Sequence, residues 1–480
     1  MPVSKDYLPI TGASGNQGTT AYTIDQSIRF HNFDTGYMKR TPSSSGNQRT
    51  WTLSMWVKRT QLGNYGVFGT RTGNTTNFFI IEFNSDDLFV QGYASGGQTL
   101  RFETTNNFRD VSAWLHLVFV ADTTNAVASE RIRIYVNGQR VTAFATQSYP
   151  AKDYDTHINS SSYENAIGGH NTGSDRVFSG YMADIVMLDG TAAGPSSFGE
   201  LNSSGIWTPI DPSGLTFGTN GFYIDGRDAS DLGDDESGQG NDYTTTGMAA
   251  HDQVLDTPTN NFAILNVTDT YAKLDGELRN GALELKDNSG SAYVYGRATF
   301  GFDVTDSDGW YWELCDIVEG SALAGITEYN TELPSGSVLA FTGARGMNAI
   351  GDSYAPSGHY KLENTTYQAT EIQDNANAGD IIQFVVKNGK VFIGINNTFP
   401  LSQNPNTEAN PIFTGLTGTF MPWGGLYSGL SYNTIYNFGQ EGTFGGNKTA
   451  QGNTDANGFG NFFYAPPSGA KALCSRSLGA

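Results

Sequence analysis

Three carboxylates near the middle of the chain are the residues best suited to acid–base chemistry. Glu313, Asp316 and Glu319 stand in the sequence ELCDIVE. Two carboxyl groups about 5–5.5 Å apart can serve as nucleophile and acid/base when a glycosidic bond is hydrolysed. In a regular strand the side chains alternate between the two faces, so Asp316 is predicted to face away from Glu313 and Glu319. A β-bulge would be needed to bring one pair together, and we favour an ordinary strand with polar residues at its end.

A second group of carboxylates could bind a cation. The segment 225–266 is acidic and rich in glycine, and its candidate ligands for calcium are Asp231, Asp234, Asp235, Glu236 and Asp242. Calcium prefers several hard oxygen ligands, but the order of residues differs from that of an EF-hand loop. The alternative is a polar turn segment in which Asp and Asn side chains cap the backbone. Calcium therefore stays open as a possible ligand, and no cofactor is required.

Other catalytic patterns are missing from the sequence. It contains neither H-E-x-x-H nor G-x-S-x-G, and its six histidines are scattered without the spacing of metal ligands. GTFGGNKT (442–449) superficially resembles a phosphate-binding loop, but Asn447 replaces the second glycine and no helix pattern follows. We expect a protein that is not an enzyme.

Composition limits the partners and the compartment. The formal net charge of -21 disfavours binding to nucleic acid, whose phosphates a protein must neutralise. The two cysteines, Cys315 and Cys474, exclude a disulfide framework. The N-terminus lacks the apolar core of a signal peptide, and no apolar run is long enough to span a membrane. We expect synthesis in a cytoplasm and no membrane insertion.

The elements that must position these residues are predicted to be strands. The stretch 114–144 contains an apolar strand from Leu115, a second strand that alternates from Ile132, and a return strand up to Phe144. Asn137-Gly138 between the last two is the strongest short hairpin signal, because a type I′ turn needs positive φ at both central residues. Similar strand–turn–strand patterns recur elsewhere in the sequence. One covers residues 78–93, and two others are centred on Asn280-Gly281 and on Asn388-Gly389. The predicted fold class is all-β, with two antiparallel jelly-roll sandwiches in tandem.

The first half of the chain resembles a known family. WLHLVFVAD and IRIYVNGQ, together with TWTLSMWVKRT (50–60), NAIGGH (165–170) and FSGYMADIVMLDG (178–190), are similar to the laminin-G/pentraxin-like branch of the concanavalin A-like jelly rolls. The last of these motifs resembles laminin-G-like domains of tailed-phage virion proteins. The resemblance covers roughly residues 26–226 and implies a binding module.

The second half resembles SPRY-type domains, which are also concanavalin-like sandwiches and binding modules. The motifs are GWYWELCDI (309–317), GDIIQFVVKNGKVFIGINN (379–397), and the later TFMPWGG and NFGQ. The C-terminal YAPPSGAKALCS resembles the ends of phage proteins with this module. No contact residues follow from this resemblance.

Both resemblances imply recognition of a host-surface glycan. Aromatic rings could stack on sugar rings while amides read hydroxyl groups, and the candidate binding residues are Asn64, Tyr65, Asn171, Trp423, Tyr427 and Tyr432. The alternative is that these rings pack the edges of the sandwiches.

The expected organisation follows from these segments. Residues 1–25 form a polar N-terminal arm, 26–226 the laminin-G/concanavalin A-like sandwich, 227–270 an acidic linker rich in glycine, and 271–480 the SPRY-like sandwich with its tail. The resemblance implies a tail-fibre, tail-associated or capsid-decorating protein of a phage virion. The arm would bind other virion proteins, and the protein is expected to form a homo-oligomer, with a trimer favoured. The rival hypotheses are a virion polysaccharide depolymerase and a structural decoration protein without ligand.

Overall fold

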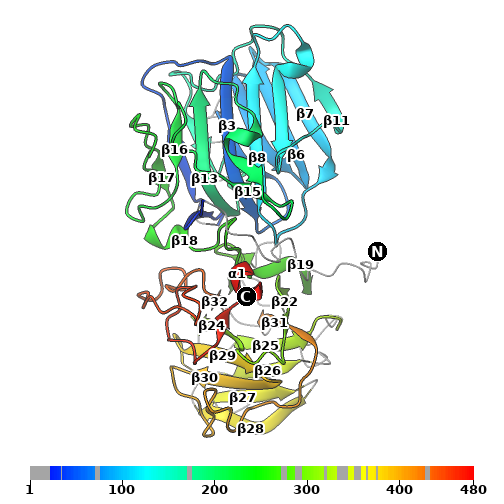
Figure 1. Cartoon of the computed structure of the whole chain (residues 1–480), viewed down its shortest axis with the longest axis vertical. Helices are drawn as coiled ribbons and strands as arrows, with labels where there is room; N and C mark the ends of the chain where they lie inside the picture. The colour runs from blue at the N-terminus through cyan, green and yellow to red at the C-terminus, as the bar shows by residue number, and fades with distance from the viewer. Residues whose placement is uncertain are drawn as a thin grey trace. The chain divides into compact units, whose positions relative to one another are not determined.

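The computed structural model describes residues 22–33, 35–70, 76–169, 176–271, 278–286, 294–317, 322–331, 344–350, 358–363, 366–374, 377–426 and 433–479. These residues fall into an N-terminal unit within Gln17–Thr259 and a C-terminal unit within Asn260–Ala480. Both consist of mainly antiparallel sheets, which confirms the predicted all-β class (Figure 1). No helix among the described ranges is long and apolar enough to cross a membrane.

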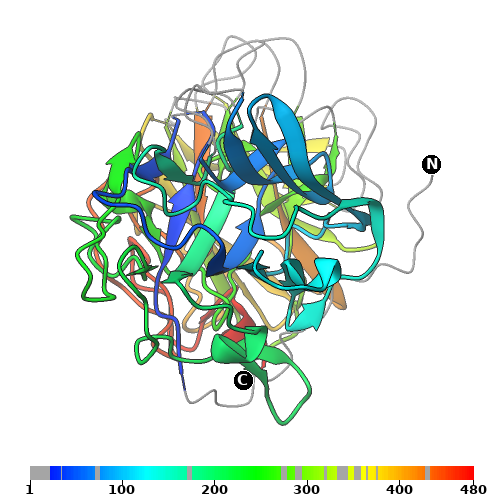
Figure 2. The same cartoon turned by 90° about the horizontal axis from the view of Figure 1, so that it is seen from above.

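The N-terminal unit is a sandwich of two eight-stranded sheets (Figure 1, Figure 2). The sheet that we call the β3 sheet has, in spatial order, β10 (Gln139–Arg140), β9 (Ile132–Val136), β8 (Leu115–Asp122), β3 (Thr50–Arg59), β13 (Gly180–Asp189), β1 (Ser27–Phe30) and β18 (Gln253–Val254), with β16 (Phe222–Ile224) also on β13. The other, the β6 sheet, has β11 (Phe144–Ser148), β7 (Gly97–Asn107), β6 (Asp87–Ala94), β5 (Phe78–Asn84), β4 (Tyr65–Gly69), β12 (Asn165–Ile167), β2 (Tyr37–Arg40) and β17 (Thr244–Thr246).

Alternation along the strands creates two apolar layers in this unit. Leu53 and Met55 of β3 point into the main core, where Phe79 and Ile81 of β5 also lie. The opposite face of the β3 sheet carries a second, smaller cluster that includes Val118, Val120, Val186, Leu188, Phe198 and Phe217. The segment that follows β13 contributes to this cluster, and it contains the 3₁₀ turn η2 (Pro195–Ser197) and the short hairpin of β14 (Gly199–Leu201) and β15 (Trp207–Pro209). This second layer creates the candidate site.

The central hairpin is confirmed at its turn and corrected at its return strand. Asn137 and Gly138 have φ values of 48° and 76°, as a type I′ turn requires. The return strand β10 is only two residues long, and Phe144 belongs instead to β11 in the other sheet. The chain therefore crosses between the sheets within the stretch that we expected to be one continuous strand.

The segment expected to be a linker is largely folded into the N-terminal unit. β17 pairs with β2, and β18 pairs with β1, so residues 244–254 extend both sheets. The 3₁₀ turn η3 (Ala250–Asp252) lies between these strands. Short polar strands at a sheet edge lack the apolar alternation from which a strand is predicted, which explains the difference.

The C-terminal unit also contains two sheets. The first, the β31 sheet, has β19 (Leu265–Tyr271), β22 (Val294–Ala298), β31 (Thr419–Leu426), β25 (Ala322–Glu328), β26 (Arg345–Ile350), β27 (Gly358–Glu363) and β28 (Thr366–Asp374), with β23 (Phe302–Asp303) on β31. The second, the β24 sheet, has β20 (Leu278–Arg279), β21 (Glu284–Lys286), β32 (Asn433–Asn437), β24 (Trp310–Asp316), β29 (Ile381–Lys387) and β30 (Lys390–Ile395), with β33 (Lys471–Ala472) parallel to β24. The short helix α1 (Ser475–Leu478) follows β33.

Two features of this unit agree with the sequence patterns. Asn388 and Gly389 have φ values of 50° and 68° and join β29 to β30, as predicted. The hydroxyl of Tyr436 in β32 donates to the carbonyl of Leu323 in β25 over 3.5 Å, so the two sheets pack against each other. Each unit is thus a sandwich of two β-sheets.

Candidate functional site

The candidate site begins with an irregularity in β13. The pairing of β13 with β3 is regular from Gly180 to Ala183, shifts, and resumes at Val186. Within the shift, Asp184 adopts φ 43°, in the left-handed region that non-glycine residues rarely occupy. β-Bulges re-aim side chains and are frequent beside functional sites. Here the bulge directs a carboxyl group to the side of the sheet that faces away from the main core.

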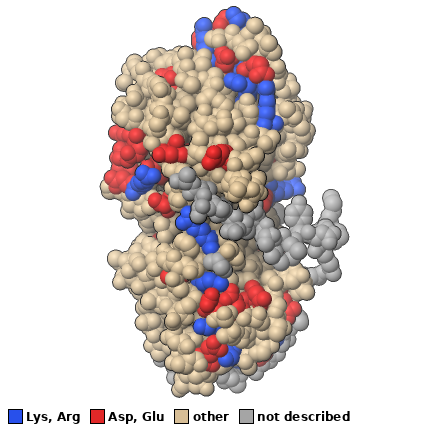
Figure 3. Space-filling view, in the orientation of Figure 1, with Lys and Arg blue, Asp and Glu red and all other residues tan. Residues whose placement is uncertain are grey.

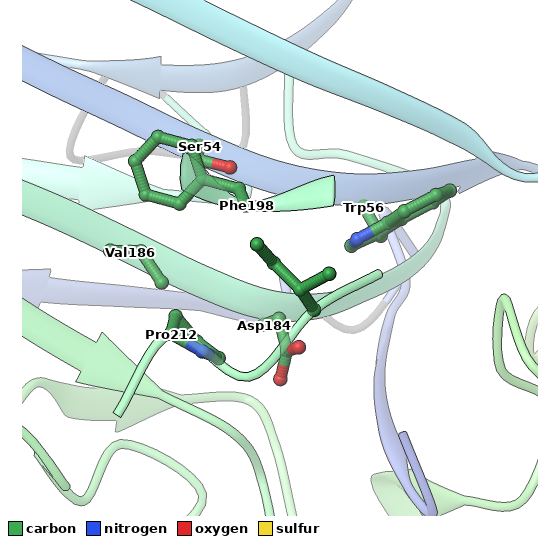
Figure 4. Close-up of a pocket in the computed structure, with 7 residues that line it drawn as sticks. Ser54, Trp56, Asp184, Val186, Phe198 and Pro212 are labelled. Atoms are coloured by element: carbon green, nitrogen blue, oxygen red, sulfur yellow. The ribbon is translucent and has the colours of Figure 1, made fainter. Parts of the chain in front are cut away.

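Asp184 lies in a small pocket on that side of the β3 sheet. The lining comes from β3, from β13 and from the segment after η2, and it comprises Ser54, Trp56, Asp184, Val186, Phe198, Ile210 and Pro212 (Figure 4). The empty space around these residues, counted together with the open solvent at the mouth, is about 170 Å³. The enclosed part is much smaller, about the size of one water molecule, so a larger ligand could contact this pocket only at its opening.

One carboxyl oxygen of Asp184 accepts hydrogen bonds from two tyrosines. Tyr223 donates its hydroxyl to Oδ1 over 2.9 Å, and Tyr22 reaches the same oxygen over 3.3 Å. No donor to Oδ2 is found among the residues that the structure describes. The side chain is 5% exposed, and this burial raises the pKa of Asp184 to about 7 although the tyrosine hydrogen bonds lower it.

The hydroxyl of Ser54 is oriented by a buried histidine. The Oγ of Ser54 lies 2.9 Å from Nε2 of His116, and the indole N–H of Trp207 lies 2.9 Å from Nδ1 of the same ring. An indole nitrogen can only donate, so Nδ1 must accept and the proton of the neutral ring sits on Nε2. Burial supports the neutral form, because it lowers the pKa of His116 to about 3.

This tautomer decides what Ser54 can do. His116 donates to Ser54 and cannot at the same time remove its proton, so the pair is not an activated nucleophile of the serine–histidine type. The hydroxyl hydrogen of Ser54 has no acceptor among the described residues and is left for a group in the pocket. Ser54 is thus a hydrogen-bond donor at this site.

Trp56 supplies the second donor. Its ring stacks on the ring of His116 with a centroid distance of 4.7 Å and an interplanar angle of 26°. Figure 4 shows its indole nitrogen turned toward the pocket, on the opposite side from Phe198. The remaining walls, Val186, Phe198, Ile210 and Pro212, are apolar. The pocket therefore combines two donors and one carboxyl group with an apolar wall.

The structure distributes the binding residues expected from the sequence over separate places. Asn64 is exposed and accepts a hydrogen bond from the backbone N–H of Ser85, while Tyr65 is half-buried and donates to Gln61. Their role in ligand binding stays a prediction. Trp423 is 1% exposed within β31, so the expectation of a surface platform for sugar is corrected for this residue: its ring packs inside the sandwich. Asn171, Tyr427 and Tyr432 lie outside the described residues.

The acidic segment forms the turns that were the alternative to a calcium site. The Asp235 carboxylate accepts hydrogen bonds from the backbone N–H groups of Tyr223, Ser237 and Asn241. Asp242 accepts from the N–H of Asp235.

Other candidate ligands in this segment are oriented toward turns or toward solvent. Asp231 accepts a hydrogen bond from Gly233, Asp234 is half-buried, and Glu236 is exposed. Figure 3 shows acidic side chains gathered on one side of the N-terminal unit. No group of three or more metal-ligating side chains occurs among the described residues, and calcium binding stays a prediction.

The surroundings of Glu313 in β24 indicate a structural role for this residue. The pairing of β24 with β32 is continuous from Glu313 to Asp316, so the two side chains project to opposite faces, as alternation predicts. Glu313 is fully buried and accepts hydrogen bonds from Tyr311 Oη and from the backbone N–H groups of Phe463 and Tyr464. Its carboxylate holds the C-terminal segment in place, and Glu319 lies outside the described residues.

The family of the N-terminal unit follows from a comparison of sequences. Residues 33–192 match the model of the concanavalin A-like lectin/glucanases superfamily of the laminin G type. These residues form a laminin G-type domain. The domain includes Ser54, Trp56, Asp184 and Val186, so the strand-borne half of the pocket belongs to it. No curated protein matches the whole-chain sequence.

Solved structures show likenesses at low scores. A pentraxin from Limulus polyphemus is 17% identical, covering 36% of this chain and 80% of its own, with a TM-score of 0.28. Domains LG4–5 of the mouse laminin α1 chain are 9% identical, covering 87% and 90%, with a TM-score of 0.30. Domain 4 of an extracellular arabinanase from Geobacillus stearothermophilus, solved with arabinotriose, is 18% identical, covering 32% and 66%, with a TM-score of 0.23.

The pocket residues were not predicted from the sequence, although one signal was present. Asp184 is the sole charged residue within the apolar run YMADIVML, and a buried acidic residue in such a strand is unusual. Ser54 and Trp56 look like ordinary members of an alternating strand. Their position beside Asp184 depends on the pairing of β3 with β13, which no local pattern specifies.

Proposed function

We propose that this protein binds carbohydrate at the Asp184 pocket without hydrolysing it. The observation that carries the proposal is the carboxyl group of Asp184, which a bulge aims into a pocket that has donors on one side and apolar walls on the other. Carbohydrates present both hydroxyl or amide groups and apolar C–H surfaces, and such a pocket offers a partner for each. The membership of residues 33–192 in a superfamily of lectins and glucanases supports the same ligand class.

The number of carboxyl groups at the pocket favours carbohydrate binding over hydrolysis. Glycosidases of the common two-carboxylate type need an acid and a second carboxylate on either side of the scissile bond. Asp184 is the one carboxyl group that lines the described pocket. Glu313, the other candidate from the sequence, is fully buried under backbone hydrogen bonds in the other unit. The rival role as a depolymerase therefore lacks a suitable pair among the described residues.

A glycan array probed with the full chain tests the proposal. We expect binding to a defined subset of glycans and at least a tenfold loss in Asp184→Asn, which keeps an acceptor for the tyrosines but replaces the free oxygen by an amide nitrogen. Glu200→Gln is the matched control, because Glu200 lies in β14 of the covering segment and is exposed. Absence of binding to every glycan would reject the proposal and leave a structural protein without ligand.

A second group of aromatic rings is an alternative binding site that the same experiment can test. His157 contacts Tyr163 and Tyr154, with ring centroids 5.0 and 6.2 Å away, and its Nε2 lies 3.0 Å from the carbonyl of Tyr93 in the β6 sheet. These rings are half-buried. Glycan binding that survives in Asp184→Asn but is lost in Tyr163→Ala would move the binding site to this cluster and reject the assignment to the Asp184 pocket.

The finer role that we propose is adhesion as part of a tailed-phage virion. It rests on the resemblance of the FSGYMADIVMLDG segment and the C-terminal tail to phage proteins, with the C-terminal unit as a SPRY-like module. Residues 1–25 would then attach the chain to other virion proteins, as a homo-oligomer with a trimer favoured. Because Tyr22 contacts Asp184 and Ile24 is buried, the deletion that tests this role ends before them. Deletion of residues 1–21 should abolish incorporation into virions while circular dichroism stays unchanged, and normal incorporation would contradict a docking arm.

A further inference from the structure

We propose that the carboxyl group of Asp184 is a pH-sensitive latch for Tyr22, an aromatic residue in the segment that leads into β1. The latch is closed, with Tyr22 held against β13 and β16, while the carboxyl group carries its proton, and it opens when the group ionises. This inference concerns the segment before β1 and does not depend on carbohydrate binding. Its basis is a contact among three oxygen atoms.

Tyr22, Tyr223 and Asp184 bring these three oxygen atoms together. The two tyrosine hydroxyls are 2.9 Å apart, and Oδ1 of Asp184 lies 2.9 Å from Oη of Tyr223 and 3.3 Å from Oη of Tyr22. Asp184 belongs to β13 and Tyr223 to β16, whereas Tyr22 precedes β1. The contact therefore ties the segment before β1 to two strands of the β3 sheet.

The number of hydrogen atoms in this contact depends on the protonation of Asp184. A tyrosine hydroxyl supplies one hydrogen and a carboxylate supplies none, so the ionised form has two hydrogens for three contacts. If both hydroxyls donate to Oδ1, the two tyrosine oxygens face each other at 2.9 Å with no hydrogen between them. A neutral carboxyl group adds the third hydrogen, and each contact is then a hydrogen bond. The arrangement therefore suits the protonated form.

The titration of Asp184 falls in a useful range, and its neighbours do not titrate there. Burial raises the pKa of Asp184 to about 7, although the hydrogen bonds from Tyr223 and Tyr22 lower it. Burial also raises the pKa of both tyrosines, so their hydroxyls keep their hydrogens on either side of pH 7. His116, which stacks on Trp56, stays neutral because burial lowers its pKa to about 3. One proton at Asp184 thus decides the state of the contact.

Two charged side chains near Asp184 come from the segment after β16. Asp225 is buried and repels a charge on Asp184, whereas Arg227 attracts it. Nε of Arg227 lies 3.2 Å from Oδ2 of Asp225, and the Arg227 side chain is 55% exposed, so its charge is shared and screened by solvent. The other sides of the pocket are lined by uncharged side chains, which are Ser54, Trp56, Val186, Phe198, Ile210 and Pro212. An ionised Asp184 would therefore have no cation of its own among the described residues.

Tyr22 is the partner that can leave when Asp184 ionises. A buried carboxylate is costly unless it is well hydrogen-bonded, and departure of the Tyr22 ring would let water donate to it. Tyr223 is fixed, because it is buried in β16 and that strand pairs with β13. Tyr22 is half-buried and lies outside any strand. Ile24 is buried, and its carbonyl accepts a hydrogen bond from Thr259 over 2.7 Å, so the movement ends before Ile24.

Nuclear magnetic resonance of the full chain tests the latch on the unmutated protein. The chain contains 24 tyrosines, so tyrosine labelled with ¹³C in the ring is incorporated and the Tyr22 resonance is assigned by comparison with Tyr22→Phe. We expect this resonance to move toward the position of a solvent-exposed tyrosine as the pH rises from 5.5 to 8.5, with a midpoint near pH 7. The released population should increase about fivefold or more over this range.

Two variants show which carboxyl group is responsible. Asp184→Asn should abolish the pH response of the Tyr22 resonance, because the amide does not titrate. Asp25→Asn is the matched control, since it removes an exposed carboxylate three residues from Tyr22 and should leave the response unchanged. An unmoved Tyr22 resonance in the unmutated protein, or one that moves toward the exposed position at low pH, would overturn the inference whether or not the variants fold. A response that persists in Asp184→Asn would overturn it as well, by assigning the titration to another group.

Discussion

Gly138 and Trp207 are in close contact at the end of the central hairpin. A Cβ atom placed on Gly138 would lie 2.5 Å from Cζ3 of Trp207, closer than real side chains approach. The same Trp207 donates its indole N–H to His116, which in turn orients Ser54 in the pocket. The Asn-Gly turn predicted from the sequence thus also serves to seat the covering segment over the β3 sheet.

The substitution Gly138→Ala should therefore do more than strain a turn. Gly138 has φ 76°, and Gly96 has φ 77° with open space around its Cβ position, so Gly96→Ala is a matched control for backbone strain alone. We expect Gly96→Ala to lower the free energy of unfolding by about 1 kcal/mol. Gly138→Ala should cost about 2 kcal/mol more, because Trp207 must move from a buried contact. Urea denaturation measures both, and equal losses would show that the Trp207 contact is unimportant.

A buried ion pair should be essential to the N-terminal unit. Nζ of Lys58 lies 2.7 Å from Oδ2 of Asp256, both side chains are fully buried, and Trp114 donates to Oδ1 of the same carboxylate over 3.0 Å. Burial lowers the pKa of Lys58, and the attraction of Asp256 opposes that shift. Lys58→Met would leave a buried carboxylate without its cation, at an expected cost of about 3–5 kcal/mol.

The control for this prediction is an exposed pair. Lys152 and Asp153 are 3.3 Å apart with side chains about half exposed (53% and 46%). Lys152→Met should change the free energy of unfolding by less than about 1 kcal/mol. Thermal and urea unfolding of both variants give the comparison, and a similar small loss in each would contradict the structural role of Lys58.

Glu313→Gln is predicted to be a folding variant with intact specificity. The glutamine amide would place an NH₂ group against one of the backbone N–H donors of Phe463 and Tyr464, at a cost of about 1–3 kcal/mol. Glu328→Gln, at the exposed end of β25, should be neutral. Both variants should keep the parent's glycan specificity, and the parent should release no reducing sugar from host polysaccharide. Reducing-end release that Glu313→Gln abolishes would instead support the depolymerase hypothesis.

Stability should depend on pH through Asp184. The pKa of Asp184 is raised from 3.8 to about 7 by burial, so between these values the folded protein holds a proton that the unfolded chain releases. The contribution of Asp184 to stability is therefore largest below about pH 4, falls as the pH rises toward 7, and is constant above it. The total fall should be on the order of 2–4 kcal/mol.

Asp184→Asn should remove this slope, because the amide does not titrate. Glu313, whose pKa burial also raises to about 7, adds a similar slope that Asp184→Asn leaves in place. Urea denaturation at intervals from pH 4 to 8 separates the contributions of Asp184 and Glu313. Asp184→Asn and Glu313→Gln should each flatten only part of the curve of unfolding free energy against pH. An unchanged curve in Asp184→Asn would mean that Asp184 is ionised throughout this range.

Short-range patterns allowed the sequence to determine the fold class. Alternation defined β5, β6, β8, β9, β13 and β29, and Asn-Gly pairs located two of the tight turns, because both signals depend on residues that are close along the chain. Alternation also placed Glu313 and Asp316 on opposite faces. The end of the central hairpin was predicted wrongly, and the strands within residues 244–254 were missed because this segment was expected to be a linker. A short edge strand gains its stability from a distant partner, which local patterns do not show.

Tertiary structure alone decided the site. Ser54 and Asp184 are 130 positions apart by their numbers and meet because β3 pairs with β13, while the register shift at Asp184 reflects the packing of a whole strand. Likewise, the sequence marks Trp423 and Tyr65 equally as aromatic residues near turns, but only the packed sandwich shows that the former is buried. Residue type and local spacing determine which strands form. Which side chains share a pocket depends on contacts between segments that are remote in sequence, and local patterns hold no information about these contacts.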